Sequence, residues 1–132
     1  IPLTIKNIIN DKEIPVYGDG QAIRDWIFVL DHIDAIDTIF HKGIAGETYN
    51  VGANMEMRNL ELVKLICSSI DKKTGRKNSE NLIKLVSDRP GHDKRYAIDS
   101  SKIMNELDWF PKTKFKKGLD LTIDWYLHKL VK

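Results

Sequence analysis

The chain has 132 residues, of which 42% are hydrophobic and 30% charged, with a formal net charge of +2. So small a charge gives no support for a nucleic-acid or acidic-membrane partner. Its single cysteine, Cys67, excludes a disulfide framework and suits a reducing compartment. No apolar run approaches the roughly 18 residues that span a bilayer. We therefore expect one cytoplasmic domain over residues 1–132. Because it begins at Ile1, we expect it to be part of a longer protein.

Helix and strand patterns alternate along the chain, which predicts the α/β class. Pro15 restricts the second element to an edge strand or strand start. Asp31 and Asn59 are suitable helix caps, and Gly43 is a suitable stop. In the first half of the chain, we expect a helix over 1–10, strands over 14–17 and 24–29, a helix from 31 to 43 and a strand over 47–51. In the second half, we expect a helix from 59, a hydrophilic loop over 72–80, strands over 82–86 and 96–98, a helix after 99–100 and a last helix from about 116. Trp125 is expected near the buried face of this last helix.

The most charged turn of the chain, residues 87–95, lies between the last two predicted strands. It carries two arginines, a lysine, a histidine and two aspartates around Pro90-Gly91. Neighbouring guanidinium groups repel unless an anion lies beside them. The local aspartates or a bound phosphate would both supply that charge. The residues alone thus predict an α/β domain whose basic loop suits a phosphorylated ligand.

No metal site or catalytic group is predicted from motifs. Asp88 and His92 are four residues apart, but the intervening Pro90-Gly91 breaks a helix, so this spacing has no ligand geometry. Gly18-Asp19-Gly20 is only the first half of a dinucleotide-binding fingerprint and is interpreted as a turn. Neither a P-loop nor a Gly-x-Ser-x-Gly motif is present.

The segment Asp88–Asp99, DRPGHDKRYAID, closely resembles the C-terminal signature of the dTDP-glucose 4,6-dehydratases, within the extended short-chain dehydrogenase/reductase superfamily. The resemblance covers almost the whole chain. Further matching segments lie at 15–18, 24–26, 31–32, 46–52, 107–111 and 125–127. One departure is Asp108, where the family more often has a glycine after the helix.

The resemblance implies a division of labour. In this family an N-terminal Rossmann domain binds NAD and carries a Tyr-x-x-x-Lys pair, yet none of the four tyrosines here is followed by lysine at that spacing. We therefore expect the small C-terminal substrate-binding domain, without the Rossmann domain, to be inactive alone. The complete enzyme would oxidise dTDP-glucose at C4 with NAD, eliminate water across C5–C6 and return the hydride to C6, giving dTDP-4-keto-6-deoxyglucose, a precursor of deoxysugars such as rhamnose. The family also implies a homodimer formed outside this chain.

The resemblance further assigns substrate contacts. Arg24 is expected at the pyrophosphate, Asn59 near the phosphates, and Tyr17 beside the thymine. The expected substrate-binding set is Pro15, Val16, Tyr17, Arg24, Asn59, Asp88, Arg89, Pro90, Gly91 and His92. Other roles remain open at this point: an ion pair with Asp25 or Asp31 for Arg24, plain helix capping for Asn59, and sheet packing for Tyr17.

Two further functions remain open from the sequence. One is a fragment of a UDP-sugar epimerase or decarboxylase, because the segments 24–26 and 49–52 resemble those enzymes as well. The other is a non-catalytic nucleotide-sugar-binding module. A preference for thymine over uracil would separate the dTDP-sugar enzyme from the UDP-sugar enzymes.

Overall fold

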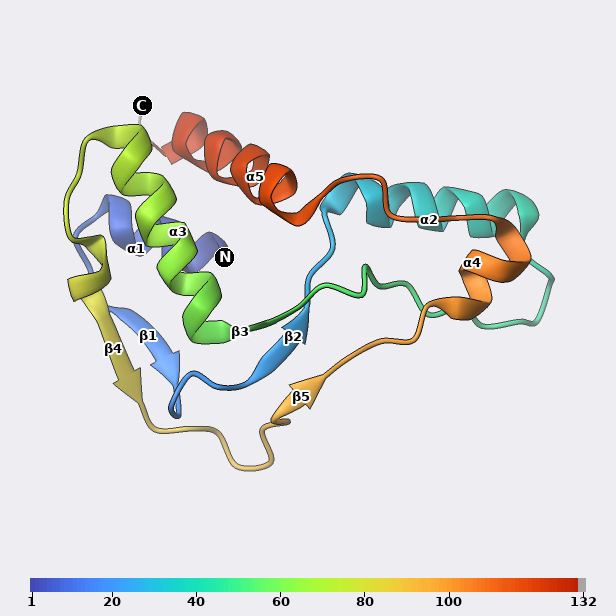
Figure 1. Cartoon of the computed structure of the whole chain (residues 1–132), viewed down its shortest axis with the longest axis horizontal. Helices are drawn as coiled ribbons and strands as arrows, with labels where there is room; N and C mark the ends of the chain where they lie inside the picture. Colours follow the sequence, from blue (N-terminus) through green and yellow to red (C-terminus); the bar gives the residue numbers. More distant parts are fainter. Residues whose placement is uncertain (131–132) are drawn as a thin grey trace.

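The computed structural model describes residues 1–130 and confirms a mixed α/β chain with short strands (Figure 1). Its elements are α1 (Pro2–Ile9), β1 (Ile14–Tyr17), β2 (Ile23–Asp25), α2 (Val29–Lys42), β3 (Glu56–Arg58), α3 (Asn59–Thr74), a 3₁₀ helix η1 (Ser79–Leu82), β4 (Ile83–Val86), β5 (Arg95–Tyr96), α4 (Ser101–Leu107) and α5 (Phe115–Leu130). None of these helices is both long and apolar enough to cross a membrane.

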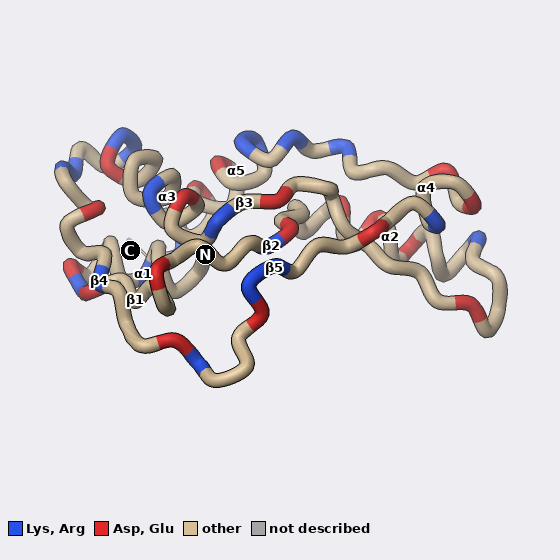
Figure 2. Tube along the Cα trace, turned by 60° about the horizontal axis from the view of Figure 1, so that its bottom comes forward, with Lys and Arg blue, Asp and Glu red and all other residues tan. Residues whose placement is uncertain are grey.

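The strands form two small sheets. In the first, β1 and β4 are parallel, with Tyr17 opposite Val86. In the second, β2 is central, antiparallel to β3 and parallel to β5, and Arg24 is opposite Tyr96 on β5. The loop between β4 and β5 therefore leaves one sheet and enters the other. It projects from the rest of the chain and carries charges of both signs (Figures 1 and 2).

Two apolar clusters stabilise the fold on either side of the second sheet. The larger cluster joins α1, β1, α3 and α5 around fully buried isoleucines such as Ile5, Ile66 and Ile123. The smaller cluster joins α2 and α4 through Ala35, Ile103 and the half-turn after α4. Figure 1 shows the same division, with α2 and α4 at one end and α1, α3 and α5 at the other. Burial of these side chains is the main favourable term in folding.

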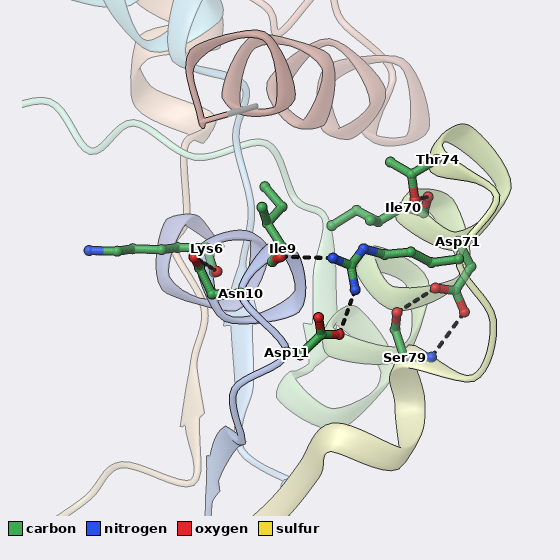
Figure 3. A network of polar contacts seen from close by, with 9 residues as sticks. Lys6, Ile9, Asn10, Asp11, Ile70, Asp71, Thr74 and Ser79 are labelled. Atoms are coloured by element: carbon green, nitrogen blue, oxygen red, sulfur yellow. Dashed lines mark hydrogen bonds and ion pairs between the residues drawn. The ribbon is translucent and has the colours of Figure 1, made fainter. Parts of the chain in front are cut away.

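A polar network ties the end of α1 to the end of α3 (Figure 3). Arg76 donates to the Asp11 carboxylate over 2.6 Å and to the Ile9 carbonyl over 2.8 Å. Beside it, Asp71 accepts hydrogen bonds from the backbone and the hydroxyl of Ser79. These contacts fix the connection that leads into β4.

Two predicted strands are wrong. The strand expected over 24–29 ends at Asp25, and no strand forms over 47–51; the missed strand is β3. The Asp25 carboxylate explains the shift, because it accepts hydrogen bonds from the amides of Ala53, over 3.1 Å, and Met55, over 2.7 Å. This turn places residues 56–58, rather than 47–51, beside β2.

Several helix boundaries also differ from expectation. Asp31 is not the cap of α2, which begins after Phe28; it is buried and accepts hydrogen bonds from the amide and hydroxyl of Thr113. Asn59 is the first residue of α3 rather than its cap. The expected loop over 72–80 is partly helical. Trp125 is 56% exposed, so its predicted place near the core is wrong.

Other local predictions are confirmed. The helices predicted over 1–10 and from about 116 form as α1 and α5, and Gly43 ends α2. Asp108 adopts the left-handed conformation, with φ of 52°, at the end of α4. Aspartate is thus held here in a conformation that glycine reaches more easily.

Candidate functional site

The projecting loop between β4 and β5 lines an open cavity of about 500 Å³ together with β2 and β5. Its lining residues come from β2, from the loop and from β5. They are Arg24, Arg89, Pro90, Gly91, His92, Asp93 and Tyr96. The structure therefore brings together predicted site residues that are more than 60 positions apart in the chain.

Arg24 is held in place by three hydrogen bonds. Its Nη1 donates to the Ile23 carbonyl over 2.6 Å, and its Nη2 donates to the Asp93 carbonyl over 2.9 Å and contacts His92 Nε2 at 2.7 Å. A guanidinium has five N–H groups. Two of them thus remain without a partner among residues 1–130, at a side chain that lines the cavity.

His92 connects Arg24 to Asp88. The second ring nitrogen of His92, Nδ1, lies 2.6 Å from Asp88 Oδ1, and the side chain is only 8% exposed. The same oxygen accepts a hydrogen bond from the Arg89 amide over 2.8 Å. Partial burial opposes ionisation of Asp88, but these hydrogen bonds and the nearby positive charge outweigh it and hold its pKa below the ordinary value.

Tyr17 forms one wall beside this network. Its ring is 48% exposed, packs edge-on against His92 at 6.4 Å, and lies 5.8 Å from the Arg89 guanidinium. Alternation along β1 explains the exposure, because Ile14 and Val16 face the core while Pro15 and Tyr17 face away from it. The Tyr17 side chain therefore faces away from the core and lies beside His92 and Arg89.

The charges of the loop are only partly neutralised within the chain. Arg95 forms a two-pronged salt bridge with Glu56 on β3, at 2.6 and 2.7 Å. Among residues 1–130, neither Arg24 nor Arg89 pairs with a carboxylate. The partners that the sequence suggested for Arg24 are engaged elsewhere, Asp25 with backbone amides and Asp31 with Thr113. Two arginines without a carboxylate partner at one cavity favour an anionic ligand.

Five residues of the predicted set do not line this cavity: Tyr17 and Asp88, which contact its lining residues, and Pro15, Val16 and Asn59. Val16 is 3% exposed and packs in the core, while Pro15 is exposed on the same face of β1 as Tyr17. Asn59 lies at the start of α3, where its amide donates to the Ala22 carbonyl and the next amide donates to Gly20. The first amides of this helix are therefore already hydrogen-bonded. The substrate contacts assigned to all ten residues of the predicted set stay predictions.

Two lining residues were missed from the sequence, Asp93 and Tyr96. Asp93 contributes its backbone carbonyl, which no side-chain motif reports. Tyr96 reaches the site because β5 pairs with β2 in parallel and sets it opposite Arg24. Only a prediction of strand pairing would have found it.

A second cavity, of about 320 Å³, lies between α2 and the segment after α4. There Asp34 accepts hydrogen bonds from the Trp109 indole and from Lys112, both over 3.1 Å. None of the predicted site residues lines it. No group of three or more potential metal ligands gathers within residues 1–130.

The glycines after β1 do not form a cofactor cradle. A Cβ atom at Gly20 would lie 2.7 Å from Cβ of Leu60 and 3.0 Å from Val16, and one at Gly18 would lie 3.0 Å from the Asp88 carboxylate. Both glycines thus provide close packing in a turn. The turn after β1 therefore does not fit the phosphates of a dinucleotide such as NAD.

Solved structures that share this fold include dTDP-glucose 4,6-dehydratases and a UDP-glucose 4-epimerase, which are extended short-chain dehydrogenases/reductases. The dTDP-glucose 4,6-dehydratase of Bacillus anthracis, solved in complex with NAD, is 44% identical, with a TM-score of 0.82 over 96% of this chain and 38% of that chain. DesIV, the dTDP-glucose 4,6-dehydratase of Streptomyces venezuelae solved with NAD and TYD bound, is 36% identical, with a TM-score of 0.88 over 97% of this chain and 38% of that chain.

The chain belongs to the GDP-mannose 4,6 dehydratase family, which it matches over residues 1–122. The dTDP-glucose 4,6-dehydratase of Xanthomonas campestris pv. campestris is 51% identical over 130 residues, covering 96% of this chain and 37% of the relative. The chain thus spans little more than a third of the length of such relatives and matches their C-terminal portion. The family resemblance of the Asp88–Asp99 segment is confirmed.

Proposed function

We propose that this chain is the substrate-binding portion of an NAD-dependent dTDP-glucose 4,6-dehydratase, and that its cavity binds the diphosphate of dTDP-glucose. One observation carries the proposal: Arg24 and Arg89 line a single cavity without a carboxylate partner among residues 1–130. A diphosphate supplies the negative charge and the multiple oxygen acceptors that two guanidiniums bind well.

The nucleotide base would pack beside the phosphates. Tyr17 offers an exposed aromatic face next to Arg89, and Tyr96 offers another at the cavity. Aromatic faces bind flat bases by stacking. The names of the relatives support thymidine rather than uridine as the nucleoside, because the half-identical relatives are dTDP-glucose enzymes.

The chemical step would require residues outside this chain. NAD supplies a hydride acceptor and donor when it is bound, and we propose that it binds outside the described residues 1–130, in a longer, cytoplasmic and homodimeric enzyme. The role of the described residues is to bind and orient the substrate. This 132-residue chain is accordingly expected to be inactive alone.

Isothermal titration calorimetry of the 132-residue chain with dTDP, and with UDP for comparison, tests the proposal. We expect saturable binding that prefers dTDP and weakens by roughly 10- to 100-fold in Arg24→Ala, because charge-assisted hydrogen bonds are lost. Arg58→Ala is the matched control, since Arg58 is exposed and pairs only with Glu61. Equal losses in both variants, or a chain that binds UDP more tightly than dTDP, would contradict the proposal.

A further inference from the structure

The contacts of Arg24 dictate where the proton of His92 lies. A guanidinium can only donate hydrogen bonds. The contact of 2.7 Å between Arg24 Nη2 and His92 Nε2 therefore requires a lone pair on Nε2. The proton then lies on Nδ1, which is 2.6 Å from Asp88 Oδ1 and donates to it. Both ring nitrogens of His92 are thus engaged.

We infer that Asp88 and His92 are positioning residues, which select the tautomer whose Nε2 accepts a hydrogen bond from Arg24 and so aim Arg24 at a diphosphate ligand. This inference rests on the proposed function. Asp88 does not line the cavity, and His92 lines it with a ring whose two nitrogens are both engaged within the chain. The ring of His92 is nearly buried, and Asp88 reaches Arg24 only through it.

Asp88 is itself held on several sides. Its Oδ1 accepts from the Arg89 amide as well as from His92, and Gly18 allows the close approach of Oδ2. The Tyr17 ring packs edge-on against His92. The chain of contacts thus joins the end of β1, the loop and β2, and fixes Arg24 before a ligand arrives. Such preorganisation strengthens binding by lowering the entropy lost on association.

The protonation of His92 is measurable without a ligand. Nitrogen-15 NMR of the His92 ring at neutral pH distinguishes the two neutral tautomers from the imidazolium. We expect the tautomer with hydrogen on Nδ1, and we expect Arg24→Ala to shift the Nε2 resonance. A proton on Nε2 in the unmodified chain would overturn the inference.

A double-mutant cycle separates positioning from direct contact. His92→Gln places an amide oxygen near the former Nε2, whereas His92→Asn is too short to reach Arg24. We expect His92→Asn to weaken dTDP binding about 10-fold and His92→Gln to stay within about 3-fold of the unmodified chain. In the Arg24→Ala background, His92→Asn should cause no additional loss, because its effect acts through Arg24.

Additive losses in the cycle would mean that His92 contacts the ligand directly, and they would overturn the inference while leaving the proposed function intact. Equal losses in His92→Gln and His92→Asn would overturn it as well. If the unmodified chain bound no dTDP, the proposed function would fail, and with it the role of Arg24 in binding. The NMR measurement would still decide whether the hydrogen-bond chain exists.

Discussion

Gly20 and Gly75 both have a backbone φ in the left-handed region, at +72° and +75°, but their surroundings differ. A Cβ atom at Gly20 would approach Leu60 and Val16, whereas one at Gly75 would meet nothing within 4 Å. We expect Gly75→Ala to lower the free energy of unfolding by about 1 kcal/mol from backbone strain. Gly20→Ala should lower it by about 1–3 kcal/mol more, from steric overlap.

Urea denaturation of the two variants, followed by circular dichroism, measures this difference. Because the backbone cost is common to both, the difference between them isolates the contact with α3. Equal free energies of unfolding for the two variants would show that the turn after β1 can move away from Leu60. The close packing of Gly20 against Leu60 would then not constrain the site.

Cys67 is buried in the larger apolar cluster, and burial, with the nearby carboxylates of Glu80 and Asp71, raises the pKa of its thiol from 9.0 to about 11. Since the thiolate is the reactive form, the native chain should react with Ellman's reagent at pH 8 only as fast as it unfolds, and should react at once in denaturant.

The raised pKa of Cys67 also sets a pH window. Between pH 9 and about 11, the Cys67 thiol keeps its proton in the folded chain but loses it in the unfolded chain. The contribution of this group to the free energy of unfolding is therefore fully present below pH 9 and is lost as the pH rises toward 11. Fast labelling of the native chain at pH 8, with no unfolding, would contradict the burial of this thiol.

The sequence indicated most of the residues that line the site, but not which ion pairs they form. The resemblance indicated Arg24, Arg89 and His92 as binding residues, and the structure gathers them at one cavity. It did not show that Arg95 would be neutralised by Glu56, which lies 39 residues away and becomes its neighbour only through the three-stranded sheet. Strand pairing is non-local, so a spacing rule along the chain does not reveal it.

At the scale of elements, Arg76 links the end of α1 to the connection after α3 (Figure 3). Its two hydrogen bonds depend on the planar fork of the guanidinium, which lysine lacks. We expect Arg76→Lys to lower the free energy of unfolding by about 1 kcal/mol, because the side chain is partly exposed and solvent screens the pair.

The matched substitution is Arg58→Lys. Arg58 is the last residue of β3 and forms an exposed ion pair with Glu61 in the first turn of α3. It should change the stability by less than about 0.5 kcal/mol. Urea denaturation compares the two variants. Should both behave alike, the contact between Arg76 and the Ile9 carbonyl would contribute nothing to the fold.

Elements with a strong helical period were predictable, and so were β1 and β4, but the short strands of the three-stranded sheet were misplaced. In α1, α3 and α5 the apolar residues repeat on one face of the helix. Burial of that face in the larger cluster stabilises each helix. The apolar residues Tyr49 and Val51 suggested a strand, but they pack on the smaller cluster without a ladder partner. A side chain can therefore be buried by a loop as well as by a strand, and the pattern is the same in both cases.

At the scale of the whole molecule, α2 presents an unpartnered apolar stripe. Its exposed members, with Ile44 two residues beyond the helix, are Val29, Leu30, Ile33, Ile36, Phe40 and Ile44. Contiguous apolar surface of this kind favours association. We expect the 132-residue chain to self-associate with rising concentration, as measured by sedimentation velocity.

Phe40→Glu should weaken this self-association, because Phe40 is 83% exposed and lies between Ile36 and Ile44 in the stripe. Leu65→Glu is the control, since Leu65 is an exposed leucine on α3, outside the stripe. A chain that stays monomeric at all concentrations, or equal effects of the two substitutions, would count against association through α2.

We propose that the cavity between β2 and the loop before β5 binds a nucleoside diphosphate. Titration of the nitrogen-15-labelled chain with dTDP, followed by backbone amide shifts, tests it most directly. We expect saturating shifts at Tyr17, at Arg24 and across residues 88–96, and unchanged shifts at residues 34–42 and 107–112 around the second cavity. Shifts confined to the second cavity, or no shifts at any dTDP concentration, would contradict it.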